Sequence, residues 1–228
     1  VKVRQALQAL VDQTAILAAL GASPELVQHC QSMFMCDAPY TSTAATQELM
    51  KPNIEKAKAL LKEAGYKGEK VVVLHATDIL TIHLSATVLE DLMRKAGFNL
   101  DVQASDWATV AQRRFNKEPV EKGGWSLMPL QWVGFDLATP LTHYGIAHNC
   151  TNGYAGWSCD EEMGKLLAQF TVETDEAKRK ALVDQIQKRA HETVSVVLGG
   201  QFMLSSGYRS NLKGVLSTGI PVFWNIQK

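Results

Sequence analysis

The chain has 228 residues, of which 46% are hydrophobic and 20% are charged, a composition typical of a globular domain. Its 23 Lys and Arg residues balance 23 Asp and Glu residues, which argues against a nucleic-acid-binding protein because such proteins usually carry a clustered basic surplus. No apolar run approaches the roughly 18 residues that a membrane span requires.

The amino-terminal third of the chain favours helices separated by loops. Apolar residues at helical spacing predict a helix over residues 4–20, which Gly21 ends. A loop with the first two cysteines follows. Asn53 is a good N-cap for the next helix, which we expect to end at Gly65. The helical pattern begins at the first residues of the sequence, with neither an initiator Met nor a signal peptide before it. We therefore expect an excised fragment or a processed chain.

Strands and helices alternate in the middle of the chain. The mostly apolar run 70–75 predicts a central strand, and a helix follows over residues 80–96. The inner face of that helix is predicted to carry Leu84, Val88, Leu89 and Leu92. Residues 98–102 alternate like a second strand, and Asp106 can cap a short helix after it.

The last hundred residues predict one more strand, a long loop and two helices. The strand covers residues 126–132, where Pro129 indicates a sheet edge or a bulge. Glycine-rich residues 133–157 predict a loop, and helices begin at Ser158 and run over 175–193. The tail is expected to supply short strands over 196–198 and 222–224. This order indicates one α/β domain with a mixed sheet flanked by helices.

Four cysteines form two close pairs in the sequence, Cys30/Cys36 and Cys150/Cys159. Neither pair has the CxxC spacing or the histidine pair of a zinc site. We favour two local disulfides, which would indicate an oxidising compartment. The alternative is four reduced, buried thiols, since free cysteine is among the most buried residue types.

Motifs of the common enzyme classes are absent from the sequence. It contains no GxSxG elbow, no Walker A loop and no GxGxxG fingerprint. His191 and Glu192 resemble the start of an HExxH zinc-protease motif, but Ser195 occupies the place of the second histidine.

The remaining histidines give no clear catalytic pattern. His143 and His148 lie close together in one loop, so a metal site is one alternative and a structural or exposed role is the favoured one. His75 and His83 flank a predicted strand-to-helix turn, and we assign them no catalytic role.

The candidate ligand-binding segment follows the strand that ends at Trp132. Gly134 permits a turn there, and Asp136 follows among apolar neighbours that include Phe135. Ligands of open α/β sheets bind beyond the carboxyl ends of the strands. Asp136 could therefore pair with a ligand cation while Trp132 and Phe135 contact its apolar parts. The alternative is that Asp136 only caps the turn.

Several blocks of the chain resemble the dipeptide/oligopeptide class of extracellular solute-binding proteins, which serve ABC importers. The most specific is 53–66, similar to the family's NxxKAKxLLxEAGY helix, and Asp136 with Pro140 matches its DxxxP element. The other blocks are 3–13, 86–98, 158–167, 179–187, 213–215 and 223–225. They follow the family's order over essentially the whole chain, which is therefore identified as a member of this class.

The resemblance implies one lobe of a type II periplasmic-binding-protein fold. Residues 1–228 would be the carboxy-terminal lobe, and the amino-terminal lobe would lie outside this sequence. The whole protein would be periplasmic, with a signal peptide in its precursor, and would deliver a peptide or peptide-like solute to permease subunits. In peptide-binding relatives the Asp of DxxxP pairs with the ligand's terminal ammonium, a role that falls on Asp136. No enzymatic activity, cofactor or metal is expected, and Cys150/Cys159 resembles a disulfide of some relatives.

Other functions remain open at this point. The same fold also serves ligand-sensing or chemotaxis modules that dock a membrane receptor, and a hydrolase would need a nucleophile–base pair that cannot be assigned. Two positions depart from the family pattern: Gln13 stands where Arg is common, and residues 194–196 lack the usual Pro. Relatives range over peptides, nickel complexes, glutathione, opines and sugars, so ligand identity does not transfer with the fold.

Overall fold

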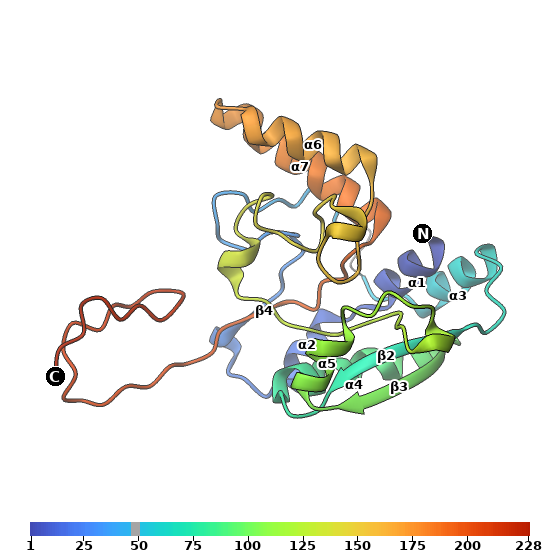
Figure 1. The fold of residues 1–228 in the computed structure, drawn as a ribbon, viewed down its shortest axis with the longest axis horizontal. Coiled ribbons are helices and arrows are strands. Elements are labelled where there is room, and N and C mark those ends of the chain that lie inside the picture. The colour runs from blue at the N-terminus through green and yellow to red at the C-terminus, as the bar shows by residue number, and fades with distance from the viewer. Residues whose placement is uncertain (47–50) are drawn as a thin grey trace.

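The computed structural model describes residues 1–46 and 51–228 and has the α/β organisation predicted from the sequence (Figure 1). The helices are α1 (Lys2–Leu10), α2 (Gln13–Ala19), α3 (Ile54–Glu63), α4 (Leu80–Ala96), α5 (Trp107–Arg113), α6 (Glu161–Val172) and α7 (Glu176–Thr193). The strands are β1 (Val27–Gln28), β2 (Lys70–Ala76), β3 (Asn99–Ser105) and β4 (Gln201–Phe202). Within these ranges no helix is both long and apolar enough to cross a membrane.

Parallel and antiparallel pairing occur in two separate ladders. Strands β2 and β3 are parallel, whereas β1 and β4 are antiparallel. The predicted strand 126–132 is reduced to one parallel bridge between Leu127 and Val73. Leu127 N donates to Val72 O, and Leu127 O accepts from Leu74 N. The next backbone donor of this edge would be Pro129, which has no N–H, so the ladder stops there.

The amino-terminal prediction of one helix over residues 4–20 is wrong in one respect. The helix breaks between α1 and α2, where Val11 is extended and the Asp12 carboxylate accepts from Ala15 N at 3.0 Å. Asp12 thus acts as a new N-cap, which the apolar periodicity of this stretch did not reveal.

The other helix boundaries follow the sequence signals closely. Each predicted or adjacent cap accepts a hydrogen bond from the backbone N–H three residues later: Asn53, Asp106, Asp160 and Asp175. Gly97 ends α4 with a φ of +96°, a left-handed conformation that glycine adopts readily.

Two predictions of burial and of tail structure need correction. The fully buried face of α4 carries Ile82, Ala86, Glu90 and Met93. All four predicted inner residues are half-buried, and two of them, Leu89 and Leu92, pack against the core. The predicted tail strands 196–198 and 222–224 are not formed among the described residues. The tail instead contributes β4 and one antiparallel bridge, Lys213 to Gln227.

Two hydrophobic clusters organise most of the body. One lies among α1, α3 and α4, and the other joins α6 and α7 to Met33 and Phe34 of the loop before α3. Both predicted disulfides are formed, Cys30–Cys36 and Cys150–Cys159.

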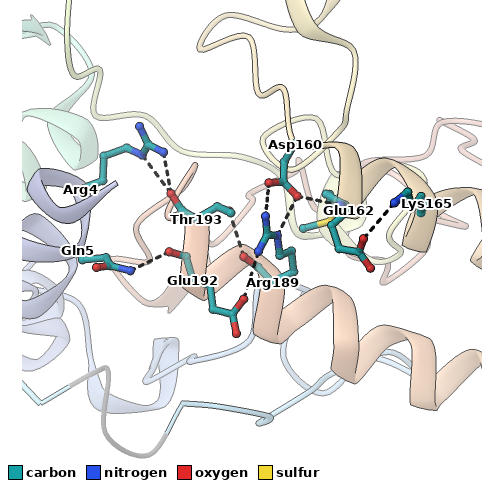
Figure 2. Close-up of polar contacts among 9 residues, drawn as sticks. Arg4, Gln5, Asp160, Glu162, Lys165, Arg189, Glu192 and Thr193 are labelled. Atoms are coloured by element: carbon teal, nitrogen blue, oxygen red, sulfur yellow. Dashed lines mark hydrogen bonds and ion pairs between the residues drawn. The ribbon is translucent and has the colours of Figure 1, made fainter.

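Polar contacts join α1 to α7 and α7 to α6 (Figure 2). From α1, Arg4 donates twice to the carbonyl O of Thr193, at 2.9 and 3.0 Å, which satisfies the carboxyl end of α7. Arg189 of α7 makes two bonds to the Asp160 carboxylate at the start of α6, at 2.8 and 2.5 Å. The Arg189 guanidinium holds the pKa of Asp160 below its ordinary value.

Candidate functional site

The candidate ligand-binding residues follow the Leu127 bridge. Because Leu127 pairs in parallel with Val73, the chain after it continues past the carboxyl end of β2. Thr81 Oγ1 donates to Gln131 Oε1 at 2.5 Å and ties this segment to the first turn of α4. A short 3-10 helix, η3 (Gly134–Leu137), comes next. The segment up to Gln131 therefore lies near the end of the sheet where α/β proteins bind ligands, and η3 follows it in the chain.

Asp136 lies within η3 and is half-buried. Its backbone N–H donates to Val133 O at 2.9 Å, so the turn itself is closed by the backbone. Among the described residues, its carboxylate has no hydrogen bond and no ion pair. The side chain is not used as a cap in the described structure, which leaves the carboxylate free for a partner.

Aromatic rings are grouped around Trp132, which precedes Asp136 in the chain. Trp132 is half-buried and lies edge-to-face with Tyr154, with ring centroids 5.8 Å apart. Tyr154 is stacked on Tyr144 at 5.9 Å. Phe135 and Tyr144 are 51% and 52% exposed, so this region offers apolar surface to a ligand.

Arg114, which the sequence analysis did not select, lies against Tyr154, one of these rings, and against Phe115. Its guanidinium is 4.8 Å from the ring centroid of Phe115 and 5.4 Å from that of Tyr154, whose hydroxyl accepts a bond from Nη1 at 3.0 Å. Its Nε is buried, and the residues that the structure describes offer it neither an acceptor nor a carboxylate. Forty positions separate Arg114 from Tyr154 in the sequence, so no local pattern could reveal this contact.

The two loop histidines occupy different environments. His143 is 1% exposed, and its ring lies edge-to-face with Trp132 at 5.6 Å. Burial lowers the pKa of His143 to about 4. His148 lies near Cys150 and Cys159, with the three potential ligand atoms within 4.8 Å of one another. Those two sulfur atoms are bonded to each other, so neither can act as a thiolate ligand.

His75, His83 and His191 belong to hydrogen-bond networks that sequence reasoning missed. His75 Nδ1 donates to Glu90 Oε1 at 2.7 Å, and His75 Nε2 lies 2.7 Å from His83 Nδ1. Because a carboxylate only accepts, His75 Nε2 is the acceptor of the His83 bond when both rings are neutral. Glu90 is 5% exposed, so this pairing explains why α4 tolerates a carboxylate on its buried face.

His191 belongs to a second network. Gln8 Nε2 lies 2.8 Å from its Nδ1, and its Nε2 lies 3.3 Å from Gln31 O. The ring is 1% exposed, and burial lowers its pKa. His191 therefore joins α1 to α7, and Ser195 completes no zinc-protease motif with it.

Comparison with known proteins identifies the family. Residues 1–154 match the bacterial extracellular solute-binding proteins, family 5, middle region. The chain is 37% identical over its whole length to a probable peptide ABC transporter periplasmic-binding protein of Sinorhizobium fredii, of which it spans 43%. It therefore spans less than half the length of that curated relative.

Solved structures have the same fold. A dipeptide-binding protein from Pseudoalteromonas, in complex with Met-Leu, matches 100% of this chain and 45% of its own length, with 20% identity and a TM-score of 0.75. The substrate-binding protein CtaP of Listeria monocytogenes matches 88% of this chain and 40% of its own, with 18% identity and a TM-score of 0.74. These likenesses establish a type II periplasmic-binding-protein fold, and with the family match they show that the chain belongs to the family 5 extracellular solute-binding proteins.

Proposed function

We propose that this chain is the carboxy-terminal lobe of a substrate-binding subunit of an ABC importer, acting outside the cytoplasm. The subunit captures a peptide or peptide-like solute between two lobes and delivers it to the membrane permease. Asp136 pairs with a cationic group of the ligand, Trp132 and Phe135 contact its apolar parts, and Gly134 allows the turn that presents them. Transport proteins of this kind bind their solute without changing it, so we expect no catalysis.

The observation that carries this proposal is the unpaired carboxylate of Asp136 in the segment that follows the Leu127 bridge to β2. A half-buried carboxylate gains little from such a position unless a cation pairs with it. Exposed aromatic side chains beside it supply the apolar contacts that ligand sites usually have. A free ammonium group on a peptide provides the matching charge.

The carboxy-terminal arm supports a second lobe as partner. After β4 the chain leaves the body and forms an extended arm, drawn in red in Figure 1. The arm exposes large apolar side chains, including Leu204, Phe223 and Trp224, with Trp224 90% exposed. Exposed apolar surface of this extent is typical of a contact with another protein surface. The curated relative is more than twice as long as this chain and is long enough to include a second lobe.

The ligand would then be enclosed only when both lobes are present. Two hollows on the described surface are lined by α6, α7 and residues 39–41, away from Asp136 and its rings. We therefore expect this chain alone to fold but to bind peptides more weakly than micromolar. Tight sites usually bury 70–90% of a ligand's surface, which one lobe cannot do.

The test uses the two-lobed protein and a panel of dipeptides with free or acetylated amino termini. A bound dipeptide at about 100 times its Kd should raise the unfolding free energy by roughly 2.7 kcal/mol. Asp136→Asn should abolish this gain, whereas Asp91→Asn, which removes an exposed carboxylate of α4, should leave it intact. Equal stabilisation by the acetylated peptides, or an unaffected Asp136→Asn variant, would refute the assigned role.

A further inference from the structure

The loop closed by the Cys30–Cys36 disulfide packs directly against the element that carries Asp136. Met35 N donates to Leu137 O at 2.9 Å, a backbone bond between this loop and η3. A Cβ atom built on Gly134 would lie 2.7 Å from Met35 Sδ, so the two segments approach as closely as a glycine allows. The loop therefore fixes η3 at both of its ends.

A row of rings connects the same loop to Trp132. Phe34, within the loop, lies edge-to-face with His143, with ring centroids 6.1 Å apart and an interplanar angle of 89°. His143 in turn lies edge-to-face with Trp132 at 5.6 Å and 80°. Phe34 and His143 are each 1% exposed, whereas Trp132 reaches the surface. Edge-to-face contacts of this kind favour one relative orientation of the rings.

Close packing around Gly145 leaves these rings little freedom. A Cβ atom at Gly145 would lie 2.9 Å from Trp132 Cη2, 3.2 Å from His143 Cε1 and 2.4 Å from Val196 Cγ2. Side chains packed this closely cannot change rotamer without moving their neighbours. The buried side of Trp132 is therefore confined by His143 and by the backbone at Gly145.

The contacts that the described structure gives the His143 ring with Phe34 and Trp132 are packing contacts. Neither of its ring nitrogens has a hydrogen-bond partner in the part of the chain that the structure describes. The ring packs against Phe34, Trp132 and Gly145, and the polar groups that affect its pKa are backbone carbonyls, its own and that of Met33. At neutral pH it is an uncharged aromatic spacer between Phe34 and Trp132.

We propose that the Cys30–Cys36 loop and His143 are positioning elements of the ligand site: the loop holds η3 in place and, through Phe34 and His143, fixes the orientation of Trp132. This inference rests on the proposed function, because Trp132 matters here as a wall of the ligand site. Its test nevertheless needs no ligand, so the two proposals can fail separately.

The experiment is fluorine NMR of the chain labelled with 5-fluorotryptophan. Trp132→Phe identifies the resonance of Trp132 among the five tryptophans of the chain. His143→Ala should broaden that resonance and move it towards the position of the free amino acid, while the other four remain in place. The double variant with serine at both cysteines of the loop should have the same selective effect. His29→Ala, at an exposed histidine, is the control and should change nothing at Trp132.

A pH titration gives an independent result. In the unmodified chain the Trp132 resonance should shift with a midpoint near pH 4, where the neighbouring imidazole gains a proton. His143→Phe retains an aromatic spacer and should keep a sharp resonance with no such shift. An unchanged Trp132 resonance in His143→Ala would overturn the proposal. If His143→Ala does not fold, the proposal is tested with His143→Phe. A Trp132 resonance that still shifts with pH in that variant would overturn the proposal.

Discussion

Acidification should destabilise the fold through His143, and the size of the effect follows from its burial. The pKa of His143 is lowered from 6.5 to about 4 because burial disfavours the charged imidazolium. Between these values the unfolded chain takes up a proton that the folded protein excludes. The contribution of this group to stability is therefore complete above pH 6.5 and is lost progressively as the pH falls to about 4.

The expected loss of unfolding free energy is a large fraction of the total stability of a domain. A difference from 6.5 to about 4, at about 1.4 kcal/mol for each pH unit, corresponds to about 3 kcal/mol. Whole domains are stable by roughly 5–15 kcal/mol. The loss should therefore be visible as a lower midpoint in urea-induced unfolding at pH 4 than at pH 7.5.

The assay compares the chain with His143→Phe, because acid also protonates carboxylates in both proteins. The unfolding free energy of the unmodified chain should fall by about 3 kcal/mol more than that of the variant between pH 7.5 and pH 4. His29→Phe, at an exposed position, should show the full loss. Equal losses in the unmodified chain and His143→Phe would refute the reasoning and indicate that the buried ring is protonated at little cost.

Three further substitutions test contacts on which the fold or the site depends. Glu90→Leu removes the acceptor of His75 Nδ1 and should lower the urea-unfolding free energy by about 2 kcal/mol, whereas Glu90→Gln, which retains an acceptor, should lower it less; equal losses would contradict this. Arg189→Met removes both bonds to the partly exposed Asp160 and should cost about 1 kcal/mol in the same assay; no loss would show that the α6–α7 pair is not stabilising. Gly145→Val should displace Trp132 and shift the tryptophan emission spectrum, and an unchanged spectrum would contradict the close packing there.

Local signals in the sequence were sufficient for most helix boundaries. Asn53 and Asp106 cap helices because a short polar side chain can reach the backbone N–H three residues later, whatever the rest of the protein does. Gly97 ends α4 because the left-handed conformation favours glycine. The break at Asp12 was missed because apolar residues continue at helical spacing on both sides of it.

Sheet structure was less predictable because a strand needs a partner. Residues 126–132 have a strand pattern, but pairing with β2 ends at Leu127, and Pro129 cannot donate the next bond. The predictions of strands over residues 196–198 and 222–224 were wrong for the same reason. The pattern of residues 222–224 is apolar, yet the backbone of this segment pairs with no strand among the described residues.

The sequence by itself determined the α/β class, most helix caps and the family, and it favoured both disulfides, since each depends on residue types at short spacing or on the order of whole blocks. It also selected Asp136 and Trp132, whose role remains a proposal. Only the tertiary structure brought Arg114 to Tyr154, His75 to Glu90 and His143 to Trp132. These contacts join segments whose proximity is set by packing of the whole core, and no local pattern encodes it.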